Sequence, residues 1–365
     1  MRIGKLPTNV YARSADRIIH KYNKDRGADC PAVCAFLCSE TWVLGSEPGY
    51  WKYEFESVMQ GLMGRYLCLR HTNRPLVLGI SLTLPINMEE PALRTLLQAI
   101  CEVCGEWNLT ICLPQIISSD AVSRAIITVQ AGHSLAPDGT AGRDSRQPDC
   151  DTGIITETLR PDNHAGITAE SYQPADTVTK PARFVLMIGH AGAAGCALLS
   201  RIHESQLYRR FSTSYIEKMQ NLRDLTPARQ GVLADIARTD PELFLFPVSE
   251  GGIYGALWDM CEELDSGITV QLKDIPVYQE TVELCDLLDL DLYKLYSAGA
   301  LLAVTGDPDG LSEKLNAAGV PASLIGCLTD TRDRVILKGD EVRFITKPDM
   351  DEIYKEPAAA QRVRG

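Results

Sequence analysis

The 365-residue sequence has no apolar run long enough to cross a lipid bilayer. Its most apolar long stretch, residues 184–199, is too short and is interrupted by His190 and several glycines. The first residues turn polar at once and offer no signal-peptide core. We therefore expect a cytoplasmic protein that makes no contact with a membrane.

An excess of positive charge is also missing. Acidic residues outnumber basic ones by 48 to 36, which gives a net charge of -12. Such a balance repels phosphate backbones, so we expect no nucleic-acid partner. It does not exclude ATP, because a phosphate site can be built locally from backbone N–H groups, a few cations and a metal ion.

Complete metal and catalytic motifs are absent. The chain has no H-E-x-x-H, no G-x-S-x-G, no P-loop and no G-x-G-x-x-G. Cys101 and Cys104 form a C-x-x-C, but no second pair or nearby histidine completes a zinc set, so core packing is favoured. The other cysteines are interpreted in the same way, with Cys34 and Cys38 on one face of a strand. In a chain this long, the 12 cysteines indicate buried thiols and not a disulfide framework.

What is present is typical of a globular protein, with 45% hydrophobic and 23% charged residues. The apolar periodicity predicts a mixed α/β fold of two domains, over residues 1–133 and 183–347. Between them, residues 134–182 are rich in Asp, Gly, Pro, Ser and Thr and are predicted to be a linker or mobile insertion, although 153–159 could pair as an edge strand. Residues 348–365 are expected to form a polar tail. We predict helices over 6–22, 57–69, 88–107, 196–211, 214–221, 229–239, 253–264, 276–288 and 308–318, and strands over 32–38, 41–44, 76–84, 109–113, 124–131, 183–188, 267–272, 301–305 and 323–328.

Two glycine turns are the candidate phosphate sites. Gly189, Gly192 and Gly195 lie between a predicted strand and a predicted helix, where backbone could approach a phosphate. Their spacing matches no nucleotide fingerprint, so close packing of the helix on the strand is at least as good an interpretation. In the second turn, Glu250-Gly251-Gly252 opens the helix at 253–264, where a tight turn capped by Ser249 is favoured over an anion site.

Several segments resemble the superfamily of aminoimidazole ribonucleotide (AIR) synthase, in its AIR-synthase-related and hydrogenase-maturation-factor HypE-like branch. Residues 249–257, S-E-G-G-I-Y-G-A-L, resemble the T-E-G-G-x-x-G-A-L element of that branch. The strand and glycine turn 184–195 resemble the start of its C-terminal domain, and 3–7 resemble its opening. Matching segments continue in order as far as 337, and the resemblance is weaker over residues 1–131.

The resemblance implies a two-domain α/β fold whose N-terminal domains pair in a homodimer, with ATP and Mg²⁺ bound near that interface. Asp29 and Glu47 would be the metal ligands. The phosphate-facing residues would be Gly189, Gly192, Glu250, Gly251 and Gly252. No catalytic residue is assigned.

The sequence departs from the family pattern in its metal and phosphate elements. The Asn-Asp pair of the family falls at Met59-Gln60, its G-G-H-T-type loop at residues 113–116, and its His-Asp at Phe246-Pro247. Two hypotheses therefore stay open. One is an ATP-dependent phosphoryl-transfer or substrate-activating protein, and the other is a non-catalytic dimeric binding or regulatory protein with a possible protein partner.

Overall fold

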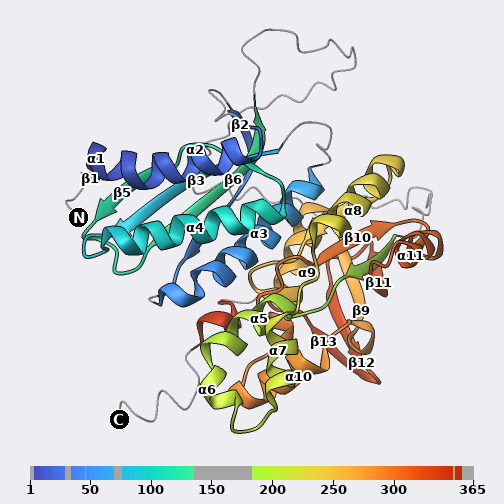
Figure 1. Ribbon diagram of the computed structural model, residues 1–365. Helices are drawn as coiled ribbons and strands as arrows, with labels where there is room; N and C mark the ends of the chain where they lie inside the picture. Colours follow the sequence, from blue (N-terminus) through green and yellow to red (C-terminus); the bar gives the residue numbers. More distant parts are fainter. Residues whose placement is uncertain are drawn as a thin grey trace, which may run out of the picture. The chain divides into compact units, whose positions relative to one another are not determined.

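The structure is a computed structural model that describes residues 4–28, 34–45, 47–69, 76–134, 183–347 and 350–355 (Figure 1). The described residues form two sheets with helices packed on them, and the predicted mixed α/β class is confirmed. The predicted linker, apart from residue 134, and the alternative edge strand at 153–159 lie outside the described residues.

The first sheet lies within residues 4–134. Its main path runs β1-β5-β3-β6-β2, and the short β4 pairs with β3. The pairs β3–β4 and β3–β5 are parallel, and the other pairs of this sheet are antiparallel. The strands are β1 (Gly4–Lys5), β2 (Cys34–Val43), β3 (Leu76–Pro85), β4 (Thr110–Ile111), β5 (Gln115–Ser119) and β6 (Ile126–Ser134).

Helices cover one face of this sheet, because alternate strand residues are apolar and point to that side. The inward set includes Leu78, Ile80 and Leu82 of β3 with Ile127 and Val129 of β6, all in one hydrophobic cluster. Neighbouring helices lie side by side over them (Figure 1). They are α1 (Thr8–Tyr11), continued by a π-helical turn (Ala12–Asp16) into α2 (Arg17–Asp25), then α3 (Trp51–Cys68), preceded by a 3₁₀ turn (Pro48–Tyr50), and α4 (Glu90–Glu106).

The prediction of two short strands at 32–38 and 41–44 is wrong, because residues 34–43 form the single strand β2. Its pairing with β6 shifts register between Phe36 and Cys38, as in a β-bulge. The bulge also overturns the expectation that Cys34 and Cys38 share one face. The Cys38 thiol points to the helix side and approaches the carbonyl of Leu62 in α3. The preceding residues of β2 turn to the other face, where the ring of Phe36 lies against Gly79 of β3.

The second sheet lies within residues 184–344, in the order β13-β12-β9-β11-β7-β10-β8. Only β9 and β12 pair in parallel. Its strands are β7 (Phe184–Ile188), β8 (Phe244–Pro247), β9 (Gly267–Gln271), β10 (Leu301–Thr305), β11 (Ala322–Thr329), β12 (Arg334–Lys338) and β13 (Glu341–Phe344).

Both faces of this second sheet are covered, and β7 is therefore a nearly continuous apolar run. Val185 and Met187 pack with α9, whereas Leu186 and Ile188 belong to the cluster that contains α8 and α11. A third cluster joins α5, α7 and α10. The helices are α5 (Ala193–Ile202), α6 (Glu204–Leu207), α7 (Thr213–Gln220), α8 (Pro227–Thr239), α9 (Gly252–Glu263), α10 (Gln279–Leu288) and α11 (Pro308–Ala317).

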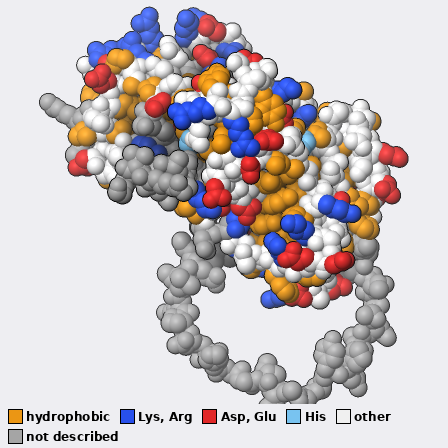
Figure 2. All heavy atoms as spheres, turned by 90° about the horizontal axis from the view of Figure 1, so that it is seen from below, with side chains coloured by type: hydrophobic (Ala, Val, Ile, Leu, Met, Phe, Trp, Pro, Cys, Tyr) orange, Lys and Arg blue, Asp and Glu red, His pale blue; other side chains and the backbone are white. Residues whose placement is uncertain are grey.

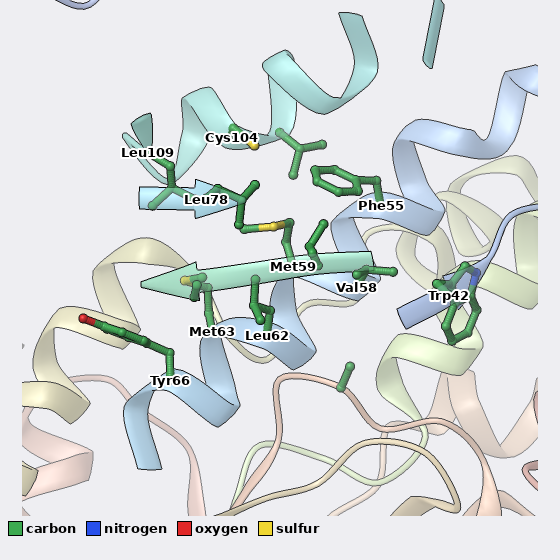
Figure 3. Close-up of a cluster of buried hydrophobic side chains, with 14 of the residues drawn as sticks. Trp42, Phe55, Val58, Met59, Leu62, Met63, Tyr66, Leu78, Cys104 and Leu109 are labelled. Carbon is green, nitrogen blue, oxygen red and sulfur yellow. The ribbon is translucent and has the colours of Figure 1, made fainter. Parts of the chain in front are cut away.

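The helix α3 is buried on almost every side, and its buried residues include the polar Glu54, Glu56 and Gln60 beside apolar ones. Phe55, Met59, Leu62 and Met63 pack among side chains of the first sheet and α4 (Figure 3). On another side, a Cβ added to Gly64 would lie 3.6 Å from Leu301 of β10. One hydrophobic cluster therefore contains α3 together with residues of both sheets.

The other sequence predictions agree at the centres of the elements and differ at their ends. The predicted helix at 196–211 starts earlier and is interrupted at His203 between α5 and α6. The helix predicted at 57–69 begins at Trp51. Strands β5, β8, β12 and β13 were not predicted. On the face shown in Figure 2, basic and acidic side chains are interspersed around hydrophobic ones. None of the helices in the described part of the chain has the length and hydropathy of a membrane span.

Candidate functional site

A cavity of about 390 Å³ opens beside the first sheet, and we call it the loop cavity. Three loops meet there: the loop from β2 to α3, the loop from β3 to α4, and the loop from β5 to β6. Trp51, Pro85 and Met88 give it apolar surface, while Asn87, Glu89, Ser123 and Arg124 give it polar groups. A mostly preformed pocket with a few polar groups is the usual form of a small-molecule site.

The buried carboxylate of Glu54 holds one wall of the loop cavity in place. It lies in the first turn of α3 and accepts a hydrogen bond of 2.8 Å from the N–H of Gly45. The indole of Trp51 donates a 2.8 Å hydrogen bond to the carbonyl of Gly45. A Cβ at Gly45 would lie 2.6 Å from the Oε1 of Glu54, so a side chain there would displace the end of this carboxylate. Burial raises the pKa of Glu54, and the Gly45 N–H and the charge of Arg124 oppose that rise.

The structure places the two predicted metal ligands differently. Glu47 is exposed, between Gly45 and Pro48, both of which line the loop cavity. Asp29 lies outside the described residues. Within the described part of the chain, no three His, Cys, Asp or Glu side chains come together as a metal cluster. Magnesium is often held by one or two carboxylates together with substrate phosphates and water, and Glu47 fits that role.

The turn at Gly189 and Gly192 uses its N–H groups within the protein. Gly192 donates a 2.7 Å hydrogen bond to the hydroxyl of Ser297, and Gly189 donates to the carbonyl of Pro321. Both glycines have positive φ, and a Cβ at Gly192 would lie 3.2 Å from the carbonyl oxygen of Leu292. These contacts support the packing interpretation. The phosphate assignment of Gly189 and Gly192 stays a prediction.

At the second turn, the backbone N–H of Gly251 binds a carboxylate of the protein itself. The carboxylate of Asp351 accepts hydrogen bonds from the N–H groups of Gly251, Tyr296 and Ile353, at 2.6, 3.0 and 2.8 Å. Burial raises the pKa of Asp351 to about 6, although these three donors oppose the rise. Asp351 is only 1% exposed, within the segment 348–365 that we expected to be a polar tail.

Gly252 is held by close packing. A Cβ there would lie 2.5 Å from the carbonyl oxygen of Tyr293, and its φ is +61°. The structure thus brings both glycine turns against the same segment, residues 292–297. The assignment of Gly251 and Gly252 to phosphate binding stays a prediction.

Glu250 is exposed and belongs to a polar cluster that joins Glu40 of the first sheet to the turn that follows β8. Glu40 of β2 forms a 2.6 Å ion pair with Arg65 of α3, and Arg65 also reaches the hydroxyl of Ser249 at 3.4 Å. Burial raises the pKa of Glu40, with a further contribution from the charge of Glu250, while Arg65 opposes the rise. Burial, and then the charge of Glu250, raises the pKa of Tyr354.

A second polar group surrounds His190, inside the first glycine turn. Its ring Nδ1 lies 2.9 Å from the buried carboxylate of Asp224, and its backbone N–H donates to the other carboxylate oxygen at 2.8 Å. The ring stacks on Tyr278 with 3.7 Å between centroids. Burial, and then the charge of Asp224, raises the pKa of Tyr278 to about 12. A carboxylate only accepts hydrogen bonds, so the Nδ1–H of His190 donates to Asp224 in this contact.

Most residues at the positions where the sequence differs from the family pattern are buried or paired in a strand. Met59 is fully buried, and Gln60 is 5% exposed, with no hydrogen-bond donor to its side-chain oxygen among the described residues. Phe246 and Pro247 are strand residues paired with β10. Of residues 113–116, Ile116 is buried in β5, while Leu113 is exposed.

Sequence reasoning missed Glu54, Arg124, Glu40 and Asp351. Glu54 carried a signal, since an acidic residue in the first turn of a helix is favoured by the helix dipole. Asp351 carried little, because two of its three partners are backbone N–H groups 100 and 55 residues away along the chain.

Comparison with known proteins places the fold. Residues 188–338 match the family model described as AIR synthase related protein, C-terminal domain. HypE in the HypE–HypF complex has 16% identity, a TM-score of 0.55, and coverage of 86% of this chain and 93% of that one. HypE in complex with ATP has 14% identity, a TM-score of 0.56, and coverage of 94% and 95%. AaThiL complexed with AMPPCP and TMP has 12% identity, a TM-score of 0.53, and coverage of 85% and 88%. By sequence, the chain matches none of the curated proteins compared with it.

The described chain therefore has the two-domain α/β fold of AIR-synthase-like proteins. The resemblance inferred from the sequence is confirmed: residues 188–338 match the AIR-synthase-related C-terminal domain model, and the solved structures share the fold.

Proposed function

We propose that the protein binds a nucleoside triphosphate, ATP in the first instance, in the loop cavity. The observation that carries the proposal is the position of this cavity, which adjoins Glu47, the residue that the family resemblance makes a metal ligand. Its 390 Å³ volume lies within the usual range of ligand pockets, about 300–1,000 Å³. The solved structures of HypE with ATP and of AaThiL with AMPPCP, which share the fold, support the same ligand class.

The residues present fit distinct parts of such a ligand. Trp51 and Met88 offer apolar surface for a base, and the exposed guanidinium of Arg124 offers a cation for phosphate oxygens. Glu47 would hold Mg²⁺ together with the phosphates, with Asp29 as a second proposed ligand. When bound, Mg²⁺ would neutralise charge on the phosphates during phosphoryl transfer. The glycine turns at Gly189, Gly192, Gly251 and Gly252, with Glu250, are proposed to contribute to the site as the family pattern implies.

The test is titration calorimetry of ATP into the purified protein, with and without Mg²⁺. We expect binding that depends on Mg²⁺, weakened about tenfold in Glu47→Gln, a loss of roughly 1.4 kcal/mol. Arg124→Gln should weaken binding with or without Mg²⁺, because it removes a phosphate contact and no metal ligand. Glu217→Gln and Arg332→Gln, both exposed on the C-terminal half, are the matched controls. Unchanged affinity in both cavity variants would contradict this assignment.

A second candidate function is a binding or regulatory protein that does not turn over ATP. It is favoured by the burial of Met59 and the strand pairing of Pro247, at positions where the family carries polar groups. ATP hydrolysis above background that is abolished in Glu47→Gln would exclude it. Binding of ATP without hydrolysis would favour it, with a protein as the partner to seek.

We also propose a cytoplasmic homodimer, in line with the family resemblance. Its support in the structure is the face of the first sheet opposite the helices. There Val43 of β2 and Ile117 of β5 are each 45% exposed, next to strand residues that point into the core.

A further inference from the structure

Two cysteine thiols meet beside the first sheet, between the start of β2 and the residue after β4. The sulfur atoms of Cys34 and Cys112 lie 3.3 Å apart, although the residues are 78 positions apart in the sequence. Both side chains are half-buried, and neither cysteine is part of a disulfide bond in the structure. Cys34 is the first residue of β2, and Cys112 follows β4 directly, so each cysteine lies at the end of a strand.

The β-bulge in β2 explains why these two thiols meet. The register shift between Phe36 and Cys38 turns the start of β2 away from the helices. Phe36 pairs with Gly132 of β6, and Gly132 also pairs with Val77 of β3. The ring of Phe36 therefore crosses a glycine and reaches Gly79, where a Cβ would lie only 2.4 Å from the ring. Because Gly132 and Gly79 have no side chain, the start of β2 can approach the end of β4.

We propose that Cys34 and Cys112 are a redox-sensitive pair that forms an intramolecular disulfide bond when the thiol pool becomes oxidised. A disulfide needs a sulfur–sulfur distance of about 2.05 Å, so closing the observed gap takes a movement of little more than 1 Å. In a reducing compartment the pair stays as two thiols, and it is poised for a transient bond of regulatory kind.

The co-reactant is a low-molecular-weight disulfide such as oxidised glutathione. One thiolate of the pair attacks a sulfur of this disulfide, forming a mixed disulfide and releasing one reduced thiolate. The second thiolate then attacks the protein sulfur of the mixed disulfide, and the other small thiolate leaves. Two electrons pass from the two cysteines to the small disulfide, which becomes two thiols and takes up the two protons released by the protein.

The bond would tie the start of β2 to the loop between β4 and β5. That loop is otherwise held by the hydroxyl of Tyr11, which donates to the carbonyl of Pro114 at 2.8 Å. The loop leads into residues 113–116, where the family pattern places a site loop. Cross-linking across 78 positions restrains the unfolded chain strongly, so the oxidised form should melt higher by roughly 5 °C.

The experiment equilibrates the purified full chain in a series of glutathione redox buffers and quenches it with an alkylating agent. Peptide mapping by mass spectrometry then identifies linked cysteines. We expect a Cys34–Cys112 linked peptide, a loss of two alkylatable thiols per chain and the rise in melting temperature. Cys34→Ser and Cys112→Ser should each abolish all three changes.

Cys38→Ser is the matched control, because Cys38 lies on the same strand with its thiol turned to the helices. Burial raises the pKa of the Cys38 thiol to about 11, so little reactive thiolate is present at neutral pH. This variant should form the linked peptide as the wild type does. Full alkylation of Cys34 and Cys112 in the most oxidising buffer would overturn the proposal, and so would a bridge to another cysteine or between two chains. None of these readouts depends on nucleotide binding.

Discussion

At the scale of single residues, three carboxyl groups are buried in surroundings of low dielectric constant, which disfavour their charged form. Glu40, Glu54 and Asp351 are all largely buried, and burial raises the pKa of each. Each has specific donors in return: an arginine for Glu40, and backbone N–H groups for the other two. Buried charges with raised pKa values collect at functional sites more often than elsewhere, which supports both the loop cavity and the cluster around Glu250 as regions to test.

Asp351 should make the stability of the protein depend on pH. Its folded pKa of about 6 is above the ordinary 3.8, so the folded state binds more protons between these values. The stability contributed by the protonated group is complete below pH 3.8 and is lost as the pH rises through 6. In urea unfolding at pH 4 to 8, the wild type should therefore lose about 1–3 kcal/mol relative to Asp351→Asn as the pH rises.

Asp330→Asn, exposed in a turn, is the control for that series and should follow the wild type. A constant difference between the wild type and Asp351→Asn across the pH range would show that Asp351 keeps its ordinary pKa.

At the scale of elements, the two glycine turns allow the helices α5 and α9 to begin close to residues 292–297. Gly252 should tolerate no side chain, because its φ is positive and a Cβ would lie 2.5 Å from a backbone oxygen. We expect Gly252→Ala to lower the free energy of unfolding by about 2–4 kcal/mol in urea titrations. Gly231→Ala is the opposite case. It lies inside α8 with open space around it, and should raise stability by about 0.5–1 kcal/mol.

If Gly252→Ala is as stable as the wild type, the close approach to residues 293–295 is not required by the fold. The pair of substitutions separates backbone strain and crowding from the general effect of adding a methyl group.

Much of the architecture could be predicted from local pattern. The helix over Glu90–Glu106 was predicted because Leu93, Leu97, Ile100 and Cys104 share one face. The single strand β2 was not predicted, because the polar pair Ser39-Glu40 was interpreted as a turn, whereas both residues pair with β6. Strand β8 was not predicted either, since its four residues end in proline and it pairs at a sheet edge. The site was harder: Glu47 and the glycines were assigned by motif and stay predictions, whereas Arg124 and Asp351 depend on contacts between distant segments.

At the scale of the whole molecule, the open face of the first sheet is the surface that the proposed homodimer would use. An exposed isoleucine or valine alone is ordinary, but Val43 and Ile117 lie on a sheet face that the described helices do not cover. We expect the wild type to have the mass of a dimer by light scattering after size exclusion, and Ile117→Glu to shift it to the monomer. Ile202→Glu, equally exposed at the end of α5, is the control and should leave the mass unchanged. A wild-type monomer at micromolar concentration would contradict the proposal.

The burial of α3 has a consequence for how the sequence can be divided. Residues 183–347 look like a self-sufficient unit by their own sheet, yet Leu301 of β10 lies against Gly64, and the hydroxyl of Tyr296 donates to the carbonyl of Ser57. A fragment beginning at residue 183 would leave these surfaces in water, and would be prone to aggregate. In evolutionary terms, substitutions in α3 are constrained twice: a side chain that fits the packing of one sheet must also fit the packing of the other.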